Sequence, residues 1–427
     1  MRILSLPLFL RSGYGYIFIS FTIIYLLLIR YCRTHYYQDP TSYFFDPERG
    51  YEPIYTRFRV SQSINYLHHV NETASRATNI TAASINKNAS LCVGIASIAR
   101  NDIDYMESTV GSLLVDLTEQ EREDMHLTLL IAHTDPSKHP FHSHKWLSAA
   151  ADTVLTYDLP QKQIDYIKKL EMGKGRPKEK ALFDYTYLLK ACQDVGTPYV
   201  IIIEDDVVAM DGWYHRTVQA LEDAARKTRD MGASRYLYLR LFYTQKFLGW
   251  NDEEWLAYFL GSLAVVASVG GVLMATLYVP YANRFLRKDI IVVLCLVCTP
   301  LCIVLFFAAG RVSMLPISAG VHQMPKFGCC TQAIAYPRER VPDVIDWYDS
   351  QQTGDADSLL ERYANENKEI RWALTPSLFQ HVGIRSSKFE DDGFRRDAKS
   401  IWNFQFESND PMALQIEHEK AVEGLHN

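Results

Sequence analysis

Three consecutive acids, Glu204, Asp205 and Asp206, follow a continuously apolar run over residues 199–203. A run of this kind predicts a strand that is buried on both faces of a sheet. Ligands of open α/β sheets bind at the carboxyl ends of the strands, which is where the three acids fall. Neighbouring carboxylates repel one another unless a cation holds them, and hard divalent cations prefer oxygen ligands. The trio is therefore a candidate metal site. The alternative is a solvated loop whose acids favour the N-terminus of the next helix, with Asp211 as its cap.

A larger α/β unit must position these acids. Apolar β-branched runs alternate with helical patterns from residue 91 onward. They predict strands over residues 91–99, 127–133, 152–159, 199–203, 235–243 and 329–337, and helices over 103–117, 161–172, 178–194, 212–229, 339–350 and 357–364. This alternation predicts a mostly parallel sheet with helices on both faces.

Three apolar segments are candidates for crossing a membrane: residues 14–29, 255–281 and 290–310. Each approaches or exceeds the roughly 20 residues that a helix needs to cross a bilayer. The first is long for a cleaved signal peptide and no small-residue cleavage site follows it, so we expect an uncleaved signal anchor. The other two could form a buried hairpin in a protein core, but their length without an internal charge favours a membrane hairpin.

Two independent signals predict the orientation in the membrane. Asn71, Asn79 and Asn88 begin three N-glycosylation sequons just after the first apolar segment, which places that region in the lumen. The loop between the second and third segments carries Arg284, Arg287 and Lys288, which places it in the cytosol. Both signals predict a cytosolic N-terminus and a lumenal bulk.

Charge and cysteine content fit this picture. The net charge of −6 is spread without a block of one sign, so we expect no nucleic-acid partner. Four cysteines fall in lumenal segments, where disulfides can form, although their pairing cannot be deduced from sequence. These are Cys92, Cys192, Cys329 and Cys330, whereas Cys295, Cys298 and Cys302 lie in the third apolar segment and are expected to be packing residues.

The soluble part is expected to be one domain that the hairpin splits in sequence. Its first portion ends on a strand without a closing element, and its second portion is too small to be stable alone. The expected order is a cytosolic tail (1–12), a signal anchor (13–31), a stem (32–90), the first catalytic portion (91–254), the membrane hairpin (255–311) and the second catalytic portion (312–427).

Several stretches resemble one family of glycosyltransferases. "KEKALFDYTYLLKACQDVGTPYVIIIEDDVVA" and "TPSLFQHVGIRSS" look like the paired signatures of the family that adds GalNAc side chains to glycosylphosphatidylinositol (GPI) anchors. They also resemble the N-acetylglucosaminyltransferase IV family. A membrane hairpin inside the catalytic domain is characteristic of the GPI family and not of the other. The stretches "RYLYLRLFYTQKFLGWN" before it and "FGCCTQAIAYPRERVP" after it also resemble the GPI family. The likeness covers residues 91–395. It implies a GT-A fold, a UDP-sugar donor, Mn²⁺ and a Golgi membrane location.

The resemblance also implies roles for the acids. Asp206, the last of the trio, would be the primary metal ligand, while Glu204 and Asp205 would face the ribose or bind the metal through water. His381, in "FQHVG", would complete the metal site or contact a phosphate. By itself His381 would be interpreted as a core histidine bonded to backbone.

Basic residues are implied at the nucleotide. Lys180 would reach the diphosphate, and Asp184 would orient Lys180 or the base. Without the resemblance, these two would be an exposed i, i+4 helical pair. Arg100 ends the first predicted strand, where such folds meet the nucleotide; it could equally be a solvated arginine.

The family makes a β-linkage from an α-linked donor, so the reaction would invert the sugar and need a general base. Asp357 is the favoured candidate and Asp355 the second, although both could simply cap a helix. Asp252, Glu253 and Glu254 are fallback candidates.

These features together predict a Golgi enzyme that transfers GalNAc, or a related hexose, from a UDP-sugar to a mannose of the GPI glycan of GPI-anchored proteins. The hairpin would bring the active site to the membrane that holds the acceptor. The alternatives are an N-glycan N-acetylglucosaminyltransferase and a non-catalytic polytopic membrane scaffold, although the apolar segments lack the internal charges typical of transporters.

Overall fold

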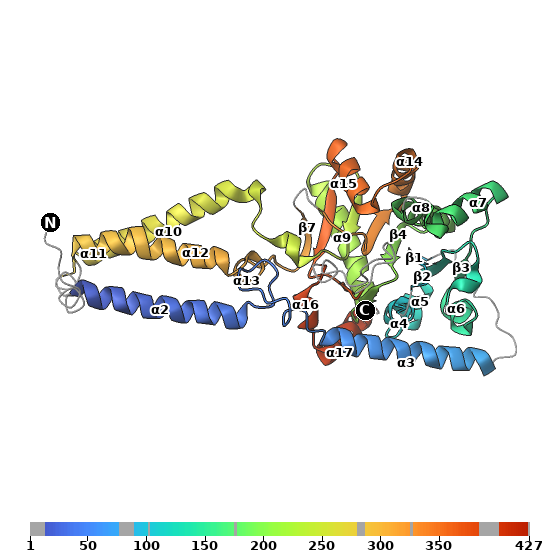
Figure 1. The fold of residues 1–427 in the computed structure, drawn as a ribbon, viewed down its shortest axis with the longest axis horizontal. Helices are drawn as coiled ribbons and strands as arrows, with labels where there is room; N and C mark the ends of the chain where they lie inside the picture. Colours follow the sequence, from blue (N-terminus) through green and yellow to red (C-terminus); the bar gives the residue numbers. More distant parts are fainter. Residues whose placement is uncertain are drawn as a thin grey trace. The chain divides into compact units, whose positions relative to one another are not determined.

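The computed structural model describes residues 13–76, 89–100, 103–174, 177–279, 287–324, 328–383 and 401–425 (Figure 1). The chain forms two compact units. Unit 1 takes Met1–Tyr51 and Leu248–Ile317, and unit 2 takes Glu52–Phe247 and Ser318–Asn427. The chain therefore passes between the units three times.

Unit 2 is built on a sheet with strand order β3-β2-β1-β4-β8-β6-β9-β7 among the described residues. The strands are β1 (Leu91–Ser97), β2 (Met125–Ile131), β3 (Thr153–Leu155), β4 (Tyr199–Glu204), β6 (Tyr238–Arg240), β7 (Gly320–Gln323), β8 (Ala333–Pro337) and β9 (Arg371–Thr375). Only β7 and β8 are antiparallel to the others, so the prediction of a largely parallel sheet is confirmed. A separate antiparallel pair joins β5 (Val207–Ala209) to β10 (Phe379–His381).

Helices cover both faces of this sheet, as the alternating pattern predicts. Successive residues of β4 point to opposite faces: Val200 and Ile202 join one core cluster, while Ile201 and Ile203 join the other. The first cluster includes side chains of α8 (Pro177–Val195), α14 (Val341–Gln351) and α15 (Ala356–Glu366). The second includes side chains of α3 (Tyr55–Arg76), α4 (Met106–Leu114), α6 (Lys145–Ala150), α9 (Trp213–Asp230), α16 (Phe404–Glu407) and α17 (Pro411–Leu425). The short helices α5 (Glu119–Glu123) and α7 (Gln161–Lys169) complete unit 2.

Helix α3 differs from the sequence prediction, which assigns residues 32–90 to a stem. Unit 2 begins at Glu52, and α3 packs against α4 and α6. Its buried residues include Thr56, Arg59 and Ser63, so its packed face is partly polar. The sequence of α3 therefore has no continuous apolar stripe from which a packed helix could be predicted. The structure nevertheless makes α3 part of unit 2.

Two predicted strands are shorter than their apolar runs. The run over 235–243 forms a ladder only at Tyr238–Arg240, and the run over 329–337 only at Ala333–Pro337. Beyond β6 the buried backbone bonds to loops instead, for example from the Tyr243 amide to the Ser377 hydroxyl at 3.0 Å. Before β8 the backbone turns at Cys330, whose φ is 86°. Apolar composition shows burial, but it does not show where a neighbouring strand ends.

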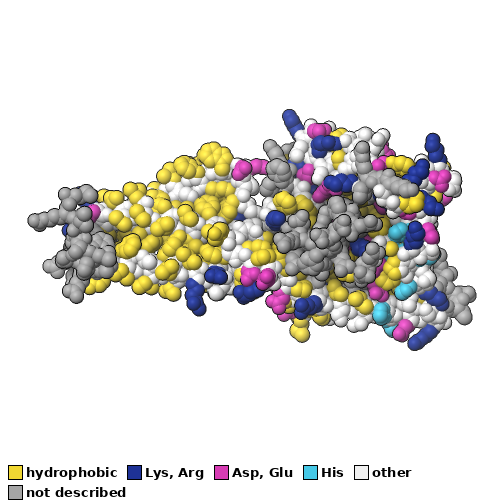
Figure 2. Space-filling model, in the orientation of Figure 1, with side chains coloured by type: hydrophobic (Ala, Val, Ile, Leu, Met, Phe, Trp, Pro, Cys, Tyr) yellow, Lys and Arg dark blue, Asp and Glu magenta, His cyan; other side chains and the backbone are white. Residues whose placement is uncertain are grey.

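Unit 1 contains α2 (Gly13–His35), α10 (Trp255–Thr276), α11 (Lys288–Val293), α12 (Thr299–Ala308) and α13 (Arg311–Met314). Three helical segments are long and apolar enough to cross a membrane: Gly15–His35, Gln245–Thr276 and Lys288–Ala308. Figure 2 shows hydrophobic side chains gathered over these helices. The three predicted apolar segments are therefore helices. Arg284 lies outside the described residues, and Arg287 and Lys288 are exposed where the described chain resumes.

The four cysteines expected in the lumen form two disulfides. Cys92 of β1 pairs with Cys192 of α8, and Cys329 pairs with its neighbour Cys330. Cys295, Cys298 and Cys302 are free, as is Cys32.

Candidate active site

The acidic trio lies at the carboxyl end of β4, where the sequence predicts it. Glu204 is the last residue of the strand, and Asp205 and Asp206 form the turn into β5. The strand before them is almost wholly buried, so the position of the trio is fixed by the core. The three carboxylates nevertheless have different partners.

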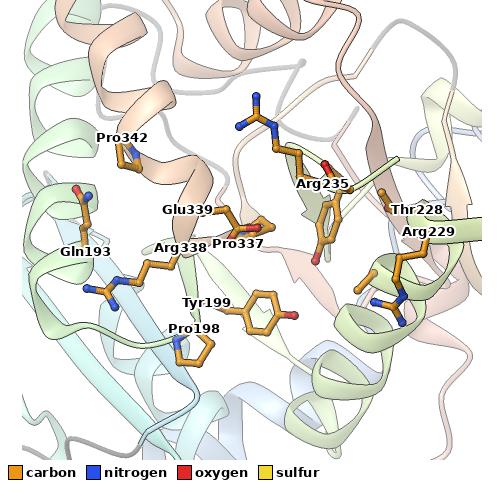
Figure 3. A pocket seen from close by; sticks show the side chains of 13 residues that line it. Gln193, Pro198, Tyr199, Thr228, Arg229, Arg235, Pro337, Arg338, Glu339 and Pro342 are labelled. Atoms are coloured by element: carbon orange, nitrogen blue, oxygen red, sulfur yellow. The ribbon is translucent and has the colours of Figure 1, made fainter. Parts of the chain in front are cut away.

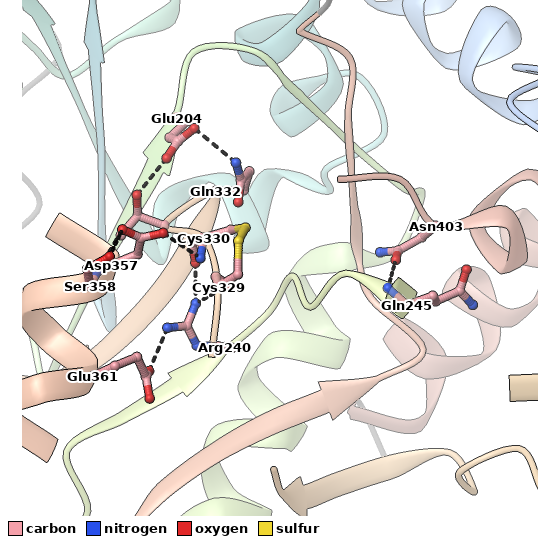
Figure 4. Close-up of a disulfide and its surroundings, with 11 residues drawn as sticks. Glu204, Arg240, Gln245, Cys329, Cys330, Gln332, Asp357, Ser358, Glu361 and Asn403 are labelled. Atoms are coloured by element: carbon pink, nitrogen blue, oxygen red, sulfur yellow. Dashed lines mark hydrogen bonds and ion pairs between the residues drawn. A yellow bond between two sulfur atoms is a disulfide. The ribbon is translucent and has the colours of Figure 1, made fainter. Parts of the chain in front are cut away.

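Glu204 is oriented by the segment that leads into β8. Its Oε1 accepts a hydrogen bond from the Thr331 hydroxyl at 2.6 Å, and its Oε2 accepts one from the Gln332 amide at 3.2 Å. The Glu204 backbone amide also donates to the Gln332 carbonyl at 3.0 Å. Figure 4 shows Glu204 and Gln332 facing one another.

Asp205 is neutralised by Arg100. Both guanidinium NH groups donate to its carboxylate, at 2.8 and 2.5 Å, and the Ser97 hydroxyl adds a bond of 2.5 Å. Arg100 and Asp205 are both buried, and the carboxylates of Asp205 and Asp206 raise the pKa of Arg100 although burial alone would lower it. Arg100 is therefore the counter-charge of the trio in this structure, and its solvated alternative is wrong.

Asp206 faces His381, as the implied metal site requires. His381 Nε2 lies 3.5 Å from Asp206 Oδ2. Burial would raise the pKa of Asp206, but His381 and then Arg100 outweigh it and lower the pKa to about 2. Burial would likewise lower the pKa of His381, but the Asp206 carboxylate raises it. The pairing of β5 with β10, His381 opposite Val207, brings these two residues together.

The surroundings of Asp206 fit a divalent cation. Its Oδ1 is buried and has no hydrogen-bond partner among the described residues. A Cβ added at Gly383 would lie 2.2 Å from Asp206 Oδ2, so the backbone at residue 383 can approach this carboxylate only because it is a glycine. An unbonded carboxylate oxygen beside an imidazole is a donor set that suits Mn²⁺.

The adjacent disulfide connects Asp357 to the trio (Figure 4). Asp357, in the first turn of α15, accepts a hydrogen bond from the Cys330 amide at 3.1 Å. Cys330 precedes Thr331, which bonds Glu204. Asp355 instead forms an ion pair of 2.5 Å with Lys178. The structure thus links Asp357, rather than Asp355, to the acidic site.

Lys180 and Asp184 form an ion pair of 2.6 Å on α8 in which Asp184 is buried and Lys180 partly buried, so the alternative of an exposed pair is wrong. Lys180 Nζ also donates to the Tyr157 hydroxyl at 2.5 Å and to the Ala132 carbonyl at 3.0 Å. Burial raises the pKa of Asp184, opposed by Lys180. Ala132 directly follows β2, so this pair lies at the same edge of the sheet as the trio.

The remaining predicted residues lie elsewhere. Asn71 is on α3, and its side-chain oxygen accepts a hydrogen bond from the Trp146 amide at 3.1 Å. Asn79 and Asn88 lie outside the described residues. The fallback acids Asp252, Glu253 and Glu254 belong to unit 1, where Glu254 pairs with Arg311 at 3.3 Å.

Comparison with known proteins tests the resemblance. The family model described as "GPI-N-acetylgalactosamine transferase PGAP4" matches residues 91–380, which is well over half of the chain. The chain belongs to the GPI-N-acetylgalactosamine transferase PGAP4 family. The match begins with β1 and ends one residue before His381, so the PGAP4 family region includes the trio, Arg100 and both candidate bases.

Two more distant relatives agree with the second resemblance. Alpha-1,3-mannosyl-glycoprotein 4-beta-N-acetylglucosaminyltransferase B of Mus musculus is 28% identical over 139 residues, and that of Homo sapiens is 31% identical over 133 residues. Each alignment covers 28% of this chain and 24% of the relative. The chain therefore spans about a quarter of the length of these curated relatives. The PGAP4 family and both relatives are glycosyltransferases by name.

Some residues of the candidate site were missed from sequence. Ser97, Thr331 and Gln332 orient the acids, and the buried Arg240 holds the carbonyls of Cys329 and Cys330 while pairing with Glu361 at 2.7 Å. Ser97 could have been found, because it lies near the carboxyl end of the strand predicted over residues 91–99. Arg240 lies inside the apolar run over 235–243, and its partners lie far along the chain.

A cavity of about 640 Å³ lies away from this site (Figure 3). Tyr199, the first residue of β4, and Pro337, the last of the antiparallel β8, both line it. It therefore lies at the edge of the sheet opposite the trio, and we do not assign it to the PGAP4 family site.

Proposed function

We propose that this chain is a Golgi-membrane glycosyltransferase with a GT-A fold. It transfers GalNAc, or a related hexose, from a UDP-sugar to a mannose of the GPI glycan with inversion of configuration. The observation that carries the proposal is the meeting of Asp206 and His381 at the carboxyl end of β4, in a chain of the family named for this transfer.

In this proposal Asp206 and His381 hold Mn²⁺. A cation held there would supply positive charge against the negative charge of the departing diphosphate. Asp205 is already paired with Arg100, so it fixes the turn rather than binding the metal directly. Glu204, oriented by Thr331 and Gln332, presents its carboxylate to the nucleotide. Lys180, held by Asp184 and Tyr157 at the same edge, contributes positive charge for the diphosphate.

Asp357 is the proposed general base. Its carboxylate is held beside the Cys329–Cys330 segment by the Cys330 amide, and this segment continues to the residues that orient Glu204. A base in this position would take the proton of the acceptor hydroxyl. Asp355 is the weaker candidate because Lys178 already engages it.

The membrane placement rests on the three apolar helices and on the sequence signals for a lumenal unit 2. A GPI acceptor is held in the bilayer by its lipid, so an enzyme with an inserted hairpin would meet it at the membrane surface. The mannosyl-glycoprotein relatives keep one alternative open, an N-glycan N-acetylglucosaminyltransferase, because their names specify that chemistry.

Nucleotide binding tests the metal site. We expect the detergent-purified full chain to bind UDP in the presence of Mn²⁺, and Asp206→Ala to weaken this binding by at least about tenfold to a hundredfold, since even residues outside the ligand set change metal affinity by that much. Asp223→Ala, which removes only an exposed partner of Arg226, is the matched control. Mn²⁺-dependent UDP binding of equal strength in wild type and Asp206→Ala would refute the assignment.

The acceptor is tested separately in cells. Mass spectrometry of GPI glycans from cells with and without this chain should show loss of an N-acetylhexosamine, or a hexose, attached to a mannose. Unchanged GPI glycans together with loss of an N-glycan branch would instead support the N-acetylglucosaminyltransferase alternative.

A further inference from the structure

Two histidines and a glutamate from three helices of unit 2 meet away from the acidic trio. Glu121 lies on α5, His215 on α9 and His418 on the C-terminal helix α17. One ligand atom from each lies within 4.8 Å of the others. All three residues belong to unit 2, and none of them has a role in the proposed transfer.

His418 is held in an orientation typical of a metal ligand. Its Nδ1 lies 2.8 Å from Asp211 Oδ1, and its Nε2 faces Glu121 at 3.0 and 3.1 Å. A carboxylate on one imidazole nitrogen fixes the tautomer and leaves the other nitrogen for a metal. Asp211 therefore acts as the orienting partner, and Glu121 lies where a second ligand is needed.

Glu121 is itself fixed in place. It forms a capping box with Thr118, whose amide and hydroxyl both donate to Glu121 Oε2 at 3.0 Å. Its Oε1 bonds to none of the groups of the capping box and points to His418 Nε2. A carboxylate that its own helix holds in this way is a preorganised ligand.

Hydrogen bonding within the protein does not explain the position of the His215 imidazole. Its Nδ1 is buried and has no hydrogen-bond partner among the described residues. Its ring lies 5.2 Å from the ring of His418. Burial, and then the nearby His418, lower the pKa of His215.

The charges also favour a cation. Glu121 and Asp211 bring two carboxylates to His418. A cavity of about 730 Å³ reaches His418 and Asp211, and its lining includes Asp116, Glu419 and Glu423 with Arg59 as the only basic residue. Arg59 is already paired with Asp116. The cavity therefore gives a dication an acidic route as far as His418 and Asp211.

We propose that Glu121, His215 and His418 form a divalent transition-metal site, best suited to Zn²⁺, that attaches α17 to unit 2. Two imidazoles and one carboxylate are an established zinc ligand set, with water in the fourth position. The proposal is independent of the proposed transferase function.

The test uses the detergent-purified full chain carrying Asp206→Ala, which removes the proposed catalytic metal site. After chelation, reloading with Zn²⁺ and desalting, we expect elemental analysis to find one Zn²⁺ per chain. Adding His215→Ala or Glu121→Gln should weaken Zn²⁺ binding at least about tenfold. Adding His142→Ala, an exposed histidine outside the cluster, should leave it unchanged. Co²⁺ in place of Zn²⁺ should give the visible absorption of tetrahedral coordination.

His215→Ala is the decisive variant, because His215 makes no hydrogen bond through Nδ1 whose loss could unfold α17. Absence of retained Zn²⁺ in the Asp206→Ala chain would overturn the proposal and leave a proton-bridged contact between His418 and its two carboxylates. Retention unaffected by His215→Ala would overturn it as well. Neither result bears on UDP binding, which Asp206 tests separately.

Discussion

At the scale of single residues, Asp205 and Asp206 are adjacent in sequence but have opposite electrostatic roles. Arg100 donates two hydrogen bonds to Asp205 inside the protein, whereas one oxygen of Asp206 has no hydrogen-bond partner among the described residues. A buried carboxylate that is already neutralised stabilises the turn, and one that is not is available for a cation. Asp205 therefore has a structural role and Asp206 is the candidate metal ligand, because Arg100 hydrogen-bonds to Asp205 and not to Asp206.

Removing Arg100 should expose this dependence. Arg100→Met leaves Asp205 charged and buried, and breaking a buried pair in this way costs about 3–5 kcal/mol of unfolding free energy. Combining it with Asp205→Asn should recover most of that loss, because the unpaired charge is gone. Urea unfolding of the detergent-purified chain, followed by tryptophan fluorescence, would measure both changes.

Arg226→Met is the control for this cycle, since its ion pair with Asp223 is exposed, and we expect it to leave the unfolding midpoint unchanged. If Arg100→Met behaves like Arg226→Met, the bidentate pair contributes little and the assignment of Asp205 to a structural role fails.

The two candidate bases can be separated by kinetics. Asp357→Asn should lower kcat by about 10²–10⁴-fold, the usual contribution of general base catalysis, while UDP binding stays unchanged. Asp355→Asn, which removes only a partly exposed ion pair with Lys178, should change kcat by less than about threefold. Steady-state assays with a UDP-sugar and a mannose acceptor would decide. A larger effect at Asp355 would reverse the assignment.

At the scale of elements, pairing between distant strands completes the candidate site. Sequence alone predicted the strand that carries the trio, because its apolar run is local. It could not place His381 next to Asp206, because that contact depends on the pairing of β10 with β5. Helix α3 escaped prediction for a related reason: it buries Arg59 through hydrogen bonds to Ala209 and Ser112 carbonyls, which no local pattern reveals.

The attachment of α17 should depend on pH when no metal is bound. Hydrogen bonds to Asp211 and then Glu121 raise the pKa of His418 to about 10. A raised histidine pKa stabilises the folded state fully below the ordinary value of about 6.5 and stops doing so as pH rises through about 10. With chelator present, the thermal midpoint should therefore fall between pH 7 and 10.

His418→Gln should remove most of this pH dependence, because glutamine does not titrate. Differential scanning fluorimetry of the two chains over that range is sufficient. An equally steep decline in His418→Gln would show that other groups, and not His418, govern the response.

At the scale of the whole molecule, unit 2 is discontinuous in sequence but complete as a fold. Residues 248–317 of unit 1 separate β6 from β7. The two ends of unit 2 at this break are tied to neighbouring positions: Ser377 donates to the Tyr243 carbonyl at 3.1 Å, and Thr375 donates to the Ser318 carbonyl at 3.0 Å. A short connection should therefore suffice to join them.

Replacing residues 248–317 with a glycine-serine linker should separate donor binding from acceptor access. We expect Mn²⁺-dependent UDP affinity to stay within about threefold, because the core of unit 2 lies within that unit. Transfer to GPI in membranes should fall by at least about tenfold relative to transfer to a short soluble mannoside, because α2 remains as the anchor but the hairpin's contribution to the effective concentration at the surface is lost. Equal loss of both transfers with UDP affinity retained would contradict the role given to the hairpin.

The strand order also constrains how the protein is made. β8 lies between β4 and β6, yet the ribosome delivers β4 and β6 before residues 248–317 and β8 after them. During translation, β4 and β6 therefore lack the strand that lies between them in the finished sheet, and their facing edges have no partner until β8 is made. If the later helices inserted in the wrong orientation, β8 would not reach β4 and β6. The unpaired edges of these two apolar strands would stay exposed, and chaperones would bind them.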